Sequence, residues 1–405
     1  MLRPFTFGRD TRVNLLLGAG HFLSHFYQLC LPPLFIAWQQ AFAVSFAELG
    51  VAMAVMSGTA ALLQTPMGFL VDRYGARPFL IGGTLVMTLS IAAMGFTTAY
   101  WQIVGLALLS GVGSSVFHPA DYAILSGSID PARLGRSFAF HTFTGNIGFA
   151  AAPPATAALM LLLGWRGALI FVGLLGLPVV LTIIWQSRIL VDQRHRSRGR
   201  TELATSGAGL LLSRSVLMFF AFFMVSSMAG AGIQSWLITI LHQVHGLPVA
   251  AASSALTGYM IGQIGGVLAG GWVADRTDRH LPFVVLLTIG AATLLLVVGV
   301  ASLTEAATIG VLFVCGLLTG ASRTPRDVMV KDAAPPGQIG KVFGFVSSGM
   351  SLGAAIMPVP YGTIIDAGRP ELVLVVVAAL LLLSLLCAGG ARVGFARARV
   401  AVAAE

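Results

Sequence analysis

Two stretches of the chain decide its fold: Gly68-Phe-Leu-Val-Asp-Arg-Tyr-Gly-Ala-Arg77 and Gly271-Trp-Val-Ala-Asp-Arg-Thr-Asp-Arg279. The second begins 203 residues after the first, and each stands at the end of a long apolar segment. Further matches recur at offsets of 205 or 206 residues: Pro119 and Asp121 with Pro325 and Asp327, Gly135-Arg136 with Gly340-Lys341, and Gly148 and Pro153 with Gly353 and Pro358. Matches that keep one order along the chain indicate two halves built on a single plan.

The composition excludes a soluble protein. Hydrophobic residues make up 57% of the 405 residues and charged residues only 10%, whereas soluble domains carry about 25% charged residues. So few charges cannot cover the surface of a soluble domain. This excludes a secreted scaffold, a disordered chain and a cytosolic enzyme.

Apolar segments of about 20 residues, long enough to cross a bilayer, recur throughout the chain. We predict twelve: 13–37, 47–71, 78–97, 101–125, 136–163, 165–187, 213–241, 250–274, 281–302, 306–330, 340–365 and 371–391. We therefore predict an all-α integral membrane protein, with six-helix bundles at 1–187 and 213–405 joined by a basic cytoplasmic linker at 188–212.

The positions of Lys and Arg predict the orientation. Twenty of the 24 basic residues share one side of the membrane if the N-terminus is cytoplasmic, as the positive-inside rule requires. We predict that both termini are cytoplasmic, in what we expect to be a bacterial inner membrane. The net charge of +9 is then a signal of topology and does not indicate binding to nucleic acid.

The duplicated segment resembles the signature loop of the major facilitator superfamily. The resemblance covers the whole chain, through span count, termini, basic central loop and repeat. It implies two six-helix bundles around a central cavity that opens alternately to each side, with spans 1, 4, 7 and 10 lining the cavity. The loop residues that we expect to gate it are Gly68, Asp72, Arg73, Gly75 and Arg77, with Asp275 and Arg276 in the second half. The alternative is that the charged residues only anchor the helices by the positive-inside rule.

A shorter motif resembles one subgroup of this superfamily. Ser114-Ser-Val-Phe-His-Pro119 resembles the fourth span of the fosmidomycin-resistance-like exporters. Two departures argue against a multidrug antiporter driven by protons. Ala107 stands where those antiporters have an arginine, and their fifth-span glycine motif survives only as Gly145-x-x-Gly148 and Pro153-Pro154.

Each of the four spans that the resemblance assigns to the cavity carries polar residues on one helical face, and such residues are costly in a bilayer. The stripes are His21, His25 and Gln28; Ser114, His118 and Asp121; Ser227, Gly230 and Gln234; and Thr319, Arg323 and Arg326. We take seven of the residues on these spans as candidate substrate ligands: His21, His25, Gln28, His118, Gln234, Arg323 and Arg326. Asp121 and His118 are the candidates for carrying a proton.

The charged candidates have structural alternatives. Arg323 and Asp327 are four residues apart and can form an ion pair within one helix, whereas Arg326 has no obvious local partner. A guanidinium suits the oxygens of a carboxylate or phosphonate, but both arginines could also belong to an inner gate. Asp121 could form an ion pair with one of them.

The histidines also have alternatives. His21 and His25 are spaced to bind one metal ion, but their span offers no carboxylate or cysteine beside them, so we predict hydrogen-bonding residues and no metal site. His141 shares a face with Gly145 and Gly148, which we interpret as a packing face. The three cysteines and the lack of a phosphate-binding loop indicate no disulfide, no cofactor and no ATP-driven mechanism.

These observations predict a secondary transporter, and not an enzyme, that moves a small anionic organic solute by alternating access with coupling to protons. The alternative is an exporter of hydrophobic or phosphonate-like drugs. A polytopic membrane enzyme or a receptor on the same fold is less favoured, because no cluster of catalytic residues stands out. The partners expected are the solute, protons and membrane lipids, with the chain acting as a monomer.

Overall fold

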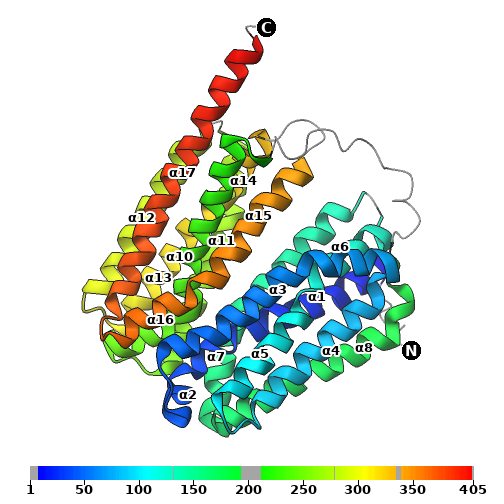
Figure 1. The fold of residues 1–405 in the computed structure, drawn as a ribbon, viewed down its shortest axis with the longest axis vertical. Helices are drawn as coiled ribbons and strands as arrows, with labels where there is room; N and C mark the ends of the chain where they lie inside the picture. Colours follow the sequence, from blue (N-terminus) through cyan, green and yellow to red (C-terminus); the bar gives the residue numbers. More distant parts are fainter. Residues whose placement is uncertain (1–7, 131, 193–210, 278, 334–338, 404–405) are drawn as a thin grey trace, which may run out of the picture. The chain divides into compact units, whose positions relative to one another are not determined.

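The structure is a computed structural model that describes residues 8–130, 132–192, 211–277, 279–333 and 339–403. Throughout these ranges the secondary structure is helical, without a strand. The helices of the first half are α1 (Arg9–Leu29), η1 (Pro32–Leu34), α2 (Phe35–Phe42), α3 (Phe46–Tyr74), α4 (Ala76–Met94), α5 (Tyr100–Ser114), α6 (Phe117–Ser128), α7 (Leu134–Leu174), α8 (Gly176–Gln186) and η2 (Ser187–Ile189). Those of the second half are α10 (Arg214–His245), α11 (Val249–Ala274), α12 (His280–Val300), α13 (Glu305–Ala321), α14 (Arg323–Ala333), α15 (Ile339–Ile356), α16 (Pro358–Asp366) and α17 (Glu371–Ala403) (Figure 1).

Eight helical stretches in the described part of the chain are long and apolar enough to cross a membrane. They are Phe46–Tyr74, Ala76–Met94, Tyr100–Ser128, Leu134–Ile189, Arg214–His245, His280–Val300, Glu305–Val330 and Glu371–Gly390. The stretch Leu134–Ile189 covers two of the predicted spans, and Gly164 at φ 67° breaks its helical backbone between them. The all-helical membrane fold is thus confirmed, while the count of twelve spans and the orientation stay predictions.

The chain divides into two compact units. One contains the described residues of Met1–Ala37 and Val55–Glu202, and the other those of Trp38–Ala54 and Leu203–Glu405. The start of α3 therefore packs with the second unit. There, the carboxylate of Asp366 accepts hydrogen bonds from the backbone N–H groups of Phe46 (2.7 Å) and Ala47 (2.8 Å). This carboxylate pairs amide groups at the first turn of α3 that have no partner within the helix.

Close packing through small residues organises each unit. In the first, α1 lies against α7, and Gly148 of α7 faces the backbone carbonyl of Phe22. In the second, α11 lies against α13, where Gly262 faces the carbonyl of Phe313 and Gly316 faces that of Tyr259. A methyl group at any of these glycines would collide with backbone atoms. Such contacts are typical of helix pairs in membranes, where small residues let backbones approach closely.

Candidate functional site

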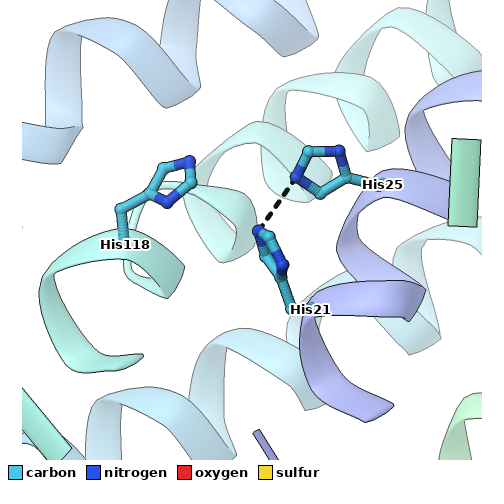
Figure 2. Close-up of side chains that lie close together, drawn as sticks. All are labelled: His21, His25 and His118. Carbon is cyan, nitrogen blue, oxygen red and sulfur yellow. Dashed lines mark hydrogen bonds between the residues drawn. The ribbon is translucent and has the colours of Figure 1, made fainter. Parts of the chain in front are cut away.

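Four histidines of the first unit form one cluster. His21 and His25 come from α1, His118 from α6 and His141 from α7. The Nδ1 atom of His21 lies 2.7 Å from the backbone oxygen of His141, and its Nε2 atom lies 3.0 Å from Nε2 of His25. One ring nitrogen from each of His21, His25 and His118 lies within 4.8 Å of the other two (Figure 2). The structure thus brings together three of the predicted substrate ligands.

Local sequence explains how the rings meet. His21 and His25 are one helical turn apart and therefore share a face of α1. Gly145 of α7 leaves room for them, because a Cβ atom there would lie 2.6 Å from Cε1 of His21 and 3.2 Å from Cδ2 of His25. His118 is the second residue of α6, just beyond the break that separates α6 from α5. The glycine and this break set the positions of the three rings.

Asp121 is a member of the same cluster. Its side chain is fully buried, and Oδ2 lies 2.7 Å from Nε2 of His141. The ring of His141 stacks on that of His21, with their centroids 3.6 Å apart. The suggested ion pair between Asp121 and an arginine is therefore replaced by this pair with His141. The other carboxyl oxygen of Asp121 has no hydrogen-bond partner among the described residues.

His141 was absent from the candidate site residues. The sequence predicts a packing face here, shared with Gly145 and Gly148, with His141 reaching the helix interface. That face does pack on α1, and because α1 carries His21 at the contact, the same glycines bring His141 into the cluster. The signal was therefore in the sequence, as an ionisable residue on the small-residue face of a helix.

Gln28 lies outside the histidine cluster. Its Nε2 atom is 3.4 Å from the hydroxyl of Ser57 on α3, and the side chain is half-buried. Gln234 is also half-buried, on α10 of the second unit, where it makes no hydrogen bond to the described residues. The structure thus gives Gln28 a structural partner and leaves the side chain of Gln234 available to a ligand.

Arg323 belongs to a polar network in the second unit. Its Nη2 atom donates to Oε1 of Gln263 at 3.1 Å. The amide nitrogen of Gln263 donates to the hydroxyl of Tyr259 at 2.9 Å, and the hydroxyl of Thr319 lies 3.3 Å from that same oxygen. These neutral groups orient the guanidinium at the first residue of α14.

Asp327 pairs with Arg326, contrary to both expectations for the two arginines. Its Oδ1 atom lies 3.0 Å from Nε and 2.9 Å from Nη2 of Arg326. The guanidinium also lies over the ring of Phe223, 4.1 Å from its centroid. Arg326 therefore has a local partner, and the suggested pair between Arg323 and Asp327 is not the one that forms.

The first signature loop is held by the chain that follows α8. Gly75 adopts φ 94°, a conformation that side chains rarely adopt, and begins α4. The backbone N–H of Ala76 donates to Asp192 at 2.7 Å, and Arg77 donates to the carbonyl of Leu190 at 2.8 and 3.3 Å. Gly75 and Arg77 thus fix the shape of the loop.

Asp72, the acidic residue of this loop, does not help to hold the loop as Gly75 and Arg77 do. Asp72 is exposed and makes no ion pair with Arg73 or Arg77 in the structure, and the guanidinium of Arg73 lies 5.2 Å from the ring centre of Tyr74. Gly68 lies on α3, where an added Cβ would be 4.0 Å from Pro119. Asp72 therefore lies exposed at the end of α3, and its role in gating stays a prediction.

The second signature loop is partly described. Asp275 is exposed at the end of α11, and its backbone N–H donates to the carbonyl of Gly271. The guanidinium of Arg276 lies over the ring of Trp272, 4.0 Å from its centroid. Asp278, which replaces the second glycine of the first loop, lies outside the described residues. Arg276 therefore packs back on its own helix.

Comparison with known proteins agrees with this fold. A solved structure of a bacterial homolog of the human lysosomal transporter Spinster, in an inward-facing and occupied conformation, superimposes with a TM-score of 0.78 at 13% identity. The superposition covers 97% of this chain and 98% of that one. At 13% identity the match shows a shared fold and nothing about the solute.

Two curated relatives from Escherichia coli match the sequence. The fosmidomycin resistance protein is 27% identical over 384 residues, which cover 92% of this chain and 91% of the relative. A probable L-galactonate transporter is 28% identical over 212 residues, 52% of this chain, which spans about half (46%) of that relative's length. The family model for the Major Facilitator Superfamily matches residues 17–256 and 241–394. The predicted resemblance is thereby confirmed: the chain belongs to the major facilitator superfamily.

Proposed function

We propose that this chain is a secondary active transporter of a small anionic organic solute, working by alternating access and coupled to protons. Membership of a transporter family already establishes that it is not an enzyme. The observation that carries the anion preference is the surroundings of Arg323. Its hydrogen-bond partner among the described residues is the neutral amide of Gln263, so its positive charge is oriented without being neutralised by that partner.

Arg323 is the better of the two arginine candidates. The charge of Arg326 is met by Asp327, which also orients it. A guanidinium held by a neutral amide keeps donors in a rigid fork that suits a carboxylate or phosphonate. Of the two, Arg323 is therefore the one that we assign to direct contact with the solute, with Arg326 as a second cationic group nearby in sequence.

Polar residues of the first unit are further candidates for contact with the solute. His21, His25 and His118 present ring nitrogens to one small volume, and neutral imidazoles both donate and accept hydrogen bonds. The side-chain amides of Gln28 and Gln234 would add hydrogen bonds to the solute. The similarity to a probable L-galactonate transporter supports a solute of this kind, since galactonate is a polyhydroxylated carboxylate.

The pair of Asp121 and His141 is the proposed proton carrier. Both side chains are buried, and ionisable residues inside a membrane protein commonly mark proton pathways. The pair is connected to His25 through the backbone oxygen of His141 and the ring of His21. His118 lies beside this connection, with its ring centroid 5.6 Å from that of His21, and remains the second candidate.

The signature loops are the proposed gating elements. In the first loop, Gly75 and Arg77 hold the backbone, while Asp72 remains exposed at the end of α3. Gly68 and Arg73 flank that carboxylate on the same helix, and Asp275 and Arg276 hold the equivalent place at the end of α11. A change of partners at these charges would shift the balance between two conformations. We assign the transporter to a bacterial inner membrane.

Counterflow into vesicles that contain the purified protein tests the proposal. L-galactonate and a panel of organic anions are the test solutes, with and without an imposed pH gradient. We expect Arg323→Gln to weaken solute binding roughly 10- to 150-fold, because a hydrogen bond to a charged group contributes about 1.5–3 kcal/mol.

The matched control is Arg369→Gln, which removes an exposed arginine paired with Glu371. It should leave binding unchanged, since exposed ion pairs contribute about 0–1 kcal/mol to stability. Equal binding by the parent and Arg323→Gln would remove Arg323 from the site. Net uptake of the solute that is indifferent to an imposed pH gradient would remove proton coupling.

The second candidate function is export of hydrophobic or phosphonate-like drugs. It is favoured by the match to the fosmidomycin resistance protein over 92% of the chain and by the motif that contains His118. Overproduction should then raise the tolerance of a sensitive bacterium to fosmidomycin. Unchanged tolerance, together with counterflow of an organic anion, would decide for the first candidate.

A further inference from the structure

The histidine cluster has a hydrogen-bond pattern that fixes the protons on two of its rings. A backbone carbonyl only accepts, so Nδ1 of His21 carries the hydrogen that it donates to His141. In a neutral imidazole the other nitrogen then has a free lone pair. The Nε2 atom of His21 therefore accepts from Nε2 of His25 at 3.0 Å.

This pattern leaves nitrogens of the cluster unsatisfied. Because His25 donates through Nε2, its Nδ1 atom carries a lone pair, and that atom is buried with no hydrogen-bond partner among the described residues. The Nδ1 atom of His118 is also buried with no hydrogen-bond partner among the described residues. An unsatisfied buried polar atom costs about 1–3 kcal/mol. A neutral imidazole can offer its electron pair on either ring nitrogen, depending on the tautomer, so the cluster can bind a ligand that accepts electron pairs from nitrogen.

A transition-metal ion is such a ligand. We propose that His21, His25 and His118 form a binding site for a divalent transition-metal ion of the Zn²⁺ type. Three imidazoles are a ligand set that suits Zn²⁺, Cu²⁺, Ni²⁺ or Co²⁺ and is poorly suited to Mg²⁺ or Ca²⁺, which prefer oxygen ligands. The site uses three histidines that we also assign to solute recognition, so metal and solute would share this volume, but the metal site does not rest on the proposed transport function.

The geometry needs only a small adjustment. Bonds of about 2.0–2.1 Å at tetrahedral angles place neighbouring ligand nitrogens about 3.3 Å apart. The nitrogens of His21 and His25 are 3.0 Å apart, and all three ligand nitrogens lie within 4.8 Å of one another. The metal would lie between the Nε2 atoms of His21 and His25, the hydrogen on Nε2 of His25 would move to Nδ1 of the same ring, and the ring of His118 would swing inward from α6 (Figure 2).

The surroundings already match those of a metal ligand. Histidines that bind metals usually donate their second ring N–H to a carbonyl or carboxylate, which fixes the tautomer and the ring orientation. His21 does this toward the backbone oxygen of His141. The stacked ring of His141, itself held by Asp121, covers one face of His21. Three protein ligands would leave the fourth tetrahedral position open to water or another oxygen ligand.

Zinc titration by calorimetry tests this site in the full-length protein, purified in detergent without a histidine tag and without any solute. We expect one Zn²⁺ per chain in the parent. His25→Ala and His118→Ala should each weaken binding at least about 10-fold, the loss that follows even from changing a residue behind a ligand. The control is His245→Gln on α10, a histidine of the other unit, which should bind zinc as the parent does.

A second measurement needs no variant and so does not depend on the folding of the mutants. X-ray absorption at the zinc edge of the loaded parent should show three imidazole ligands. Equal zinc affinity in the parent and both alanine variants would overturn the proposal, as would a spectrum with fewer than two imidazoles or a parent that binds no zinc. Transport can fail in its own assay while this site is confirmed, and the reverse also holds.

Discussion

Replacing His141 by leucine should destabilise the first unit, because it leaves the carboxyl group of Asp121 buried without its partner. The pair is short, with 2.7 Å between Nε2 and Oδ2, and Asp121 is fully buried. Leucine keeps roughly the volume of the imidazole, so the cost comes mainly from the lost partner. It should lie between about 1 kcal/mol, for an unsatisfied neutral group, and about 5 kcal/mol, for an unpaired buried charge.

The single variant alone does not separate the pair from its surroundings, so the assay is a double-mutant cycle. Unfolding free energies are measured in one detergent for the parent, His141→Leu, Asp121→Ala and the double variant. The double variant has no buried carboxyl group to leave unpaired. We therefore expect it to be more stable than the sum of the single effects predicts, by about 0.5–3 kcal/mol.

Additive effects, within about 0.3–0.5 kcal/mol, would refute the reasoning. They would mean that Asp121 and His141 are neighbours without an energetic connection, and the pair would lose its place as the proposed proton carrier. If His141→Leu lowers the unfolding free energy by close to about 5 kcal/mol, the result would indicate that Asp121 is ionised in the folded protein. The matched comparison is His245→Leu, which removes a half-buried imidazole bonded to a backbone carbonyl of the other unit.

Two glycines allow further predictions with controls on the same helices. Gly75→Ala should cost about 1–3 kcal/mol, since φ 94° is strained for a residue with a Cβ, whereas Gly82→Ala on α4, with nothing within 4 Å, should be neutral or stabilising. Gly262→Ala should destabilise the second unit by forcing α11 from a carbonyl of α13, whereas Gly265→Ala meets only an ordinary 3.6 Å contact. Thermal unfolding in detergent measures both pairs, and equal melting temperatures within a pair would contradict the assigned contacts.

Much of the fold was predictable because its determinants are local and periodic. The duplicated loops at Gly68 and Gly271 indicated the family, which the family model confirms. The break between two spans near Gly164 was also predictable, since apolar length alone limits a span. The sequence also predicted the start of α3 to within one residue, but not its contact with Asp366, which joins residues 320 positions apart.

The candidate site was predictable one helix at a time. The spacing of His21 and His25 placed both on one face, and His118 was found on its own span. The sequence placed His141 on the small-residue face of its own helix, but the meeting of the four rings depends on how α1, α6 and α7 pack against one another. The prediction of no metal site considered ligands within one span, whereas the third histidine of the site that we propose, His118, lies on another helix.

The suggested ion pair between Arg323 and Asp327 was wrong for a different reason. Residues four apart on a helix are neighbours, while adjacent residues point in different directions, so Asp327 was paired with Arg323 and not with Arg326. The long arginine side chain overrides this rule. Arg326 lies over Phe223, and its guanidinium is thereby close enough to meet the adjacent carboxylate at 2.9 and 3.0 Å.

The first signature loop illustrates how one motif can combine a structural and a functional part. Two of its positions hold the loop: Gly75 supplies the turn, and Arg77 binds the carbonyl of Leu190. Asp192 pairs the first amide of α4, a role that a loop carboxylate could have filled. Because the chain after α8 does this work, Asp72 stays exposed at the end of α3. The gating role that we propose for Asp72 requires such exposure, since the carboxylate would have to change partners without unfolding the loop that carries it.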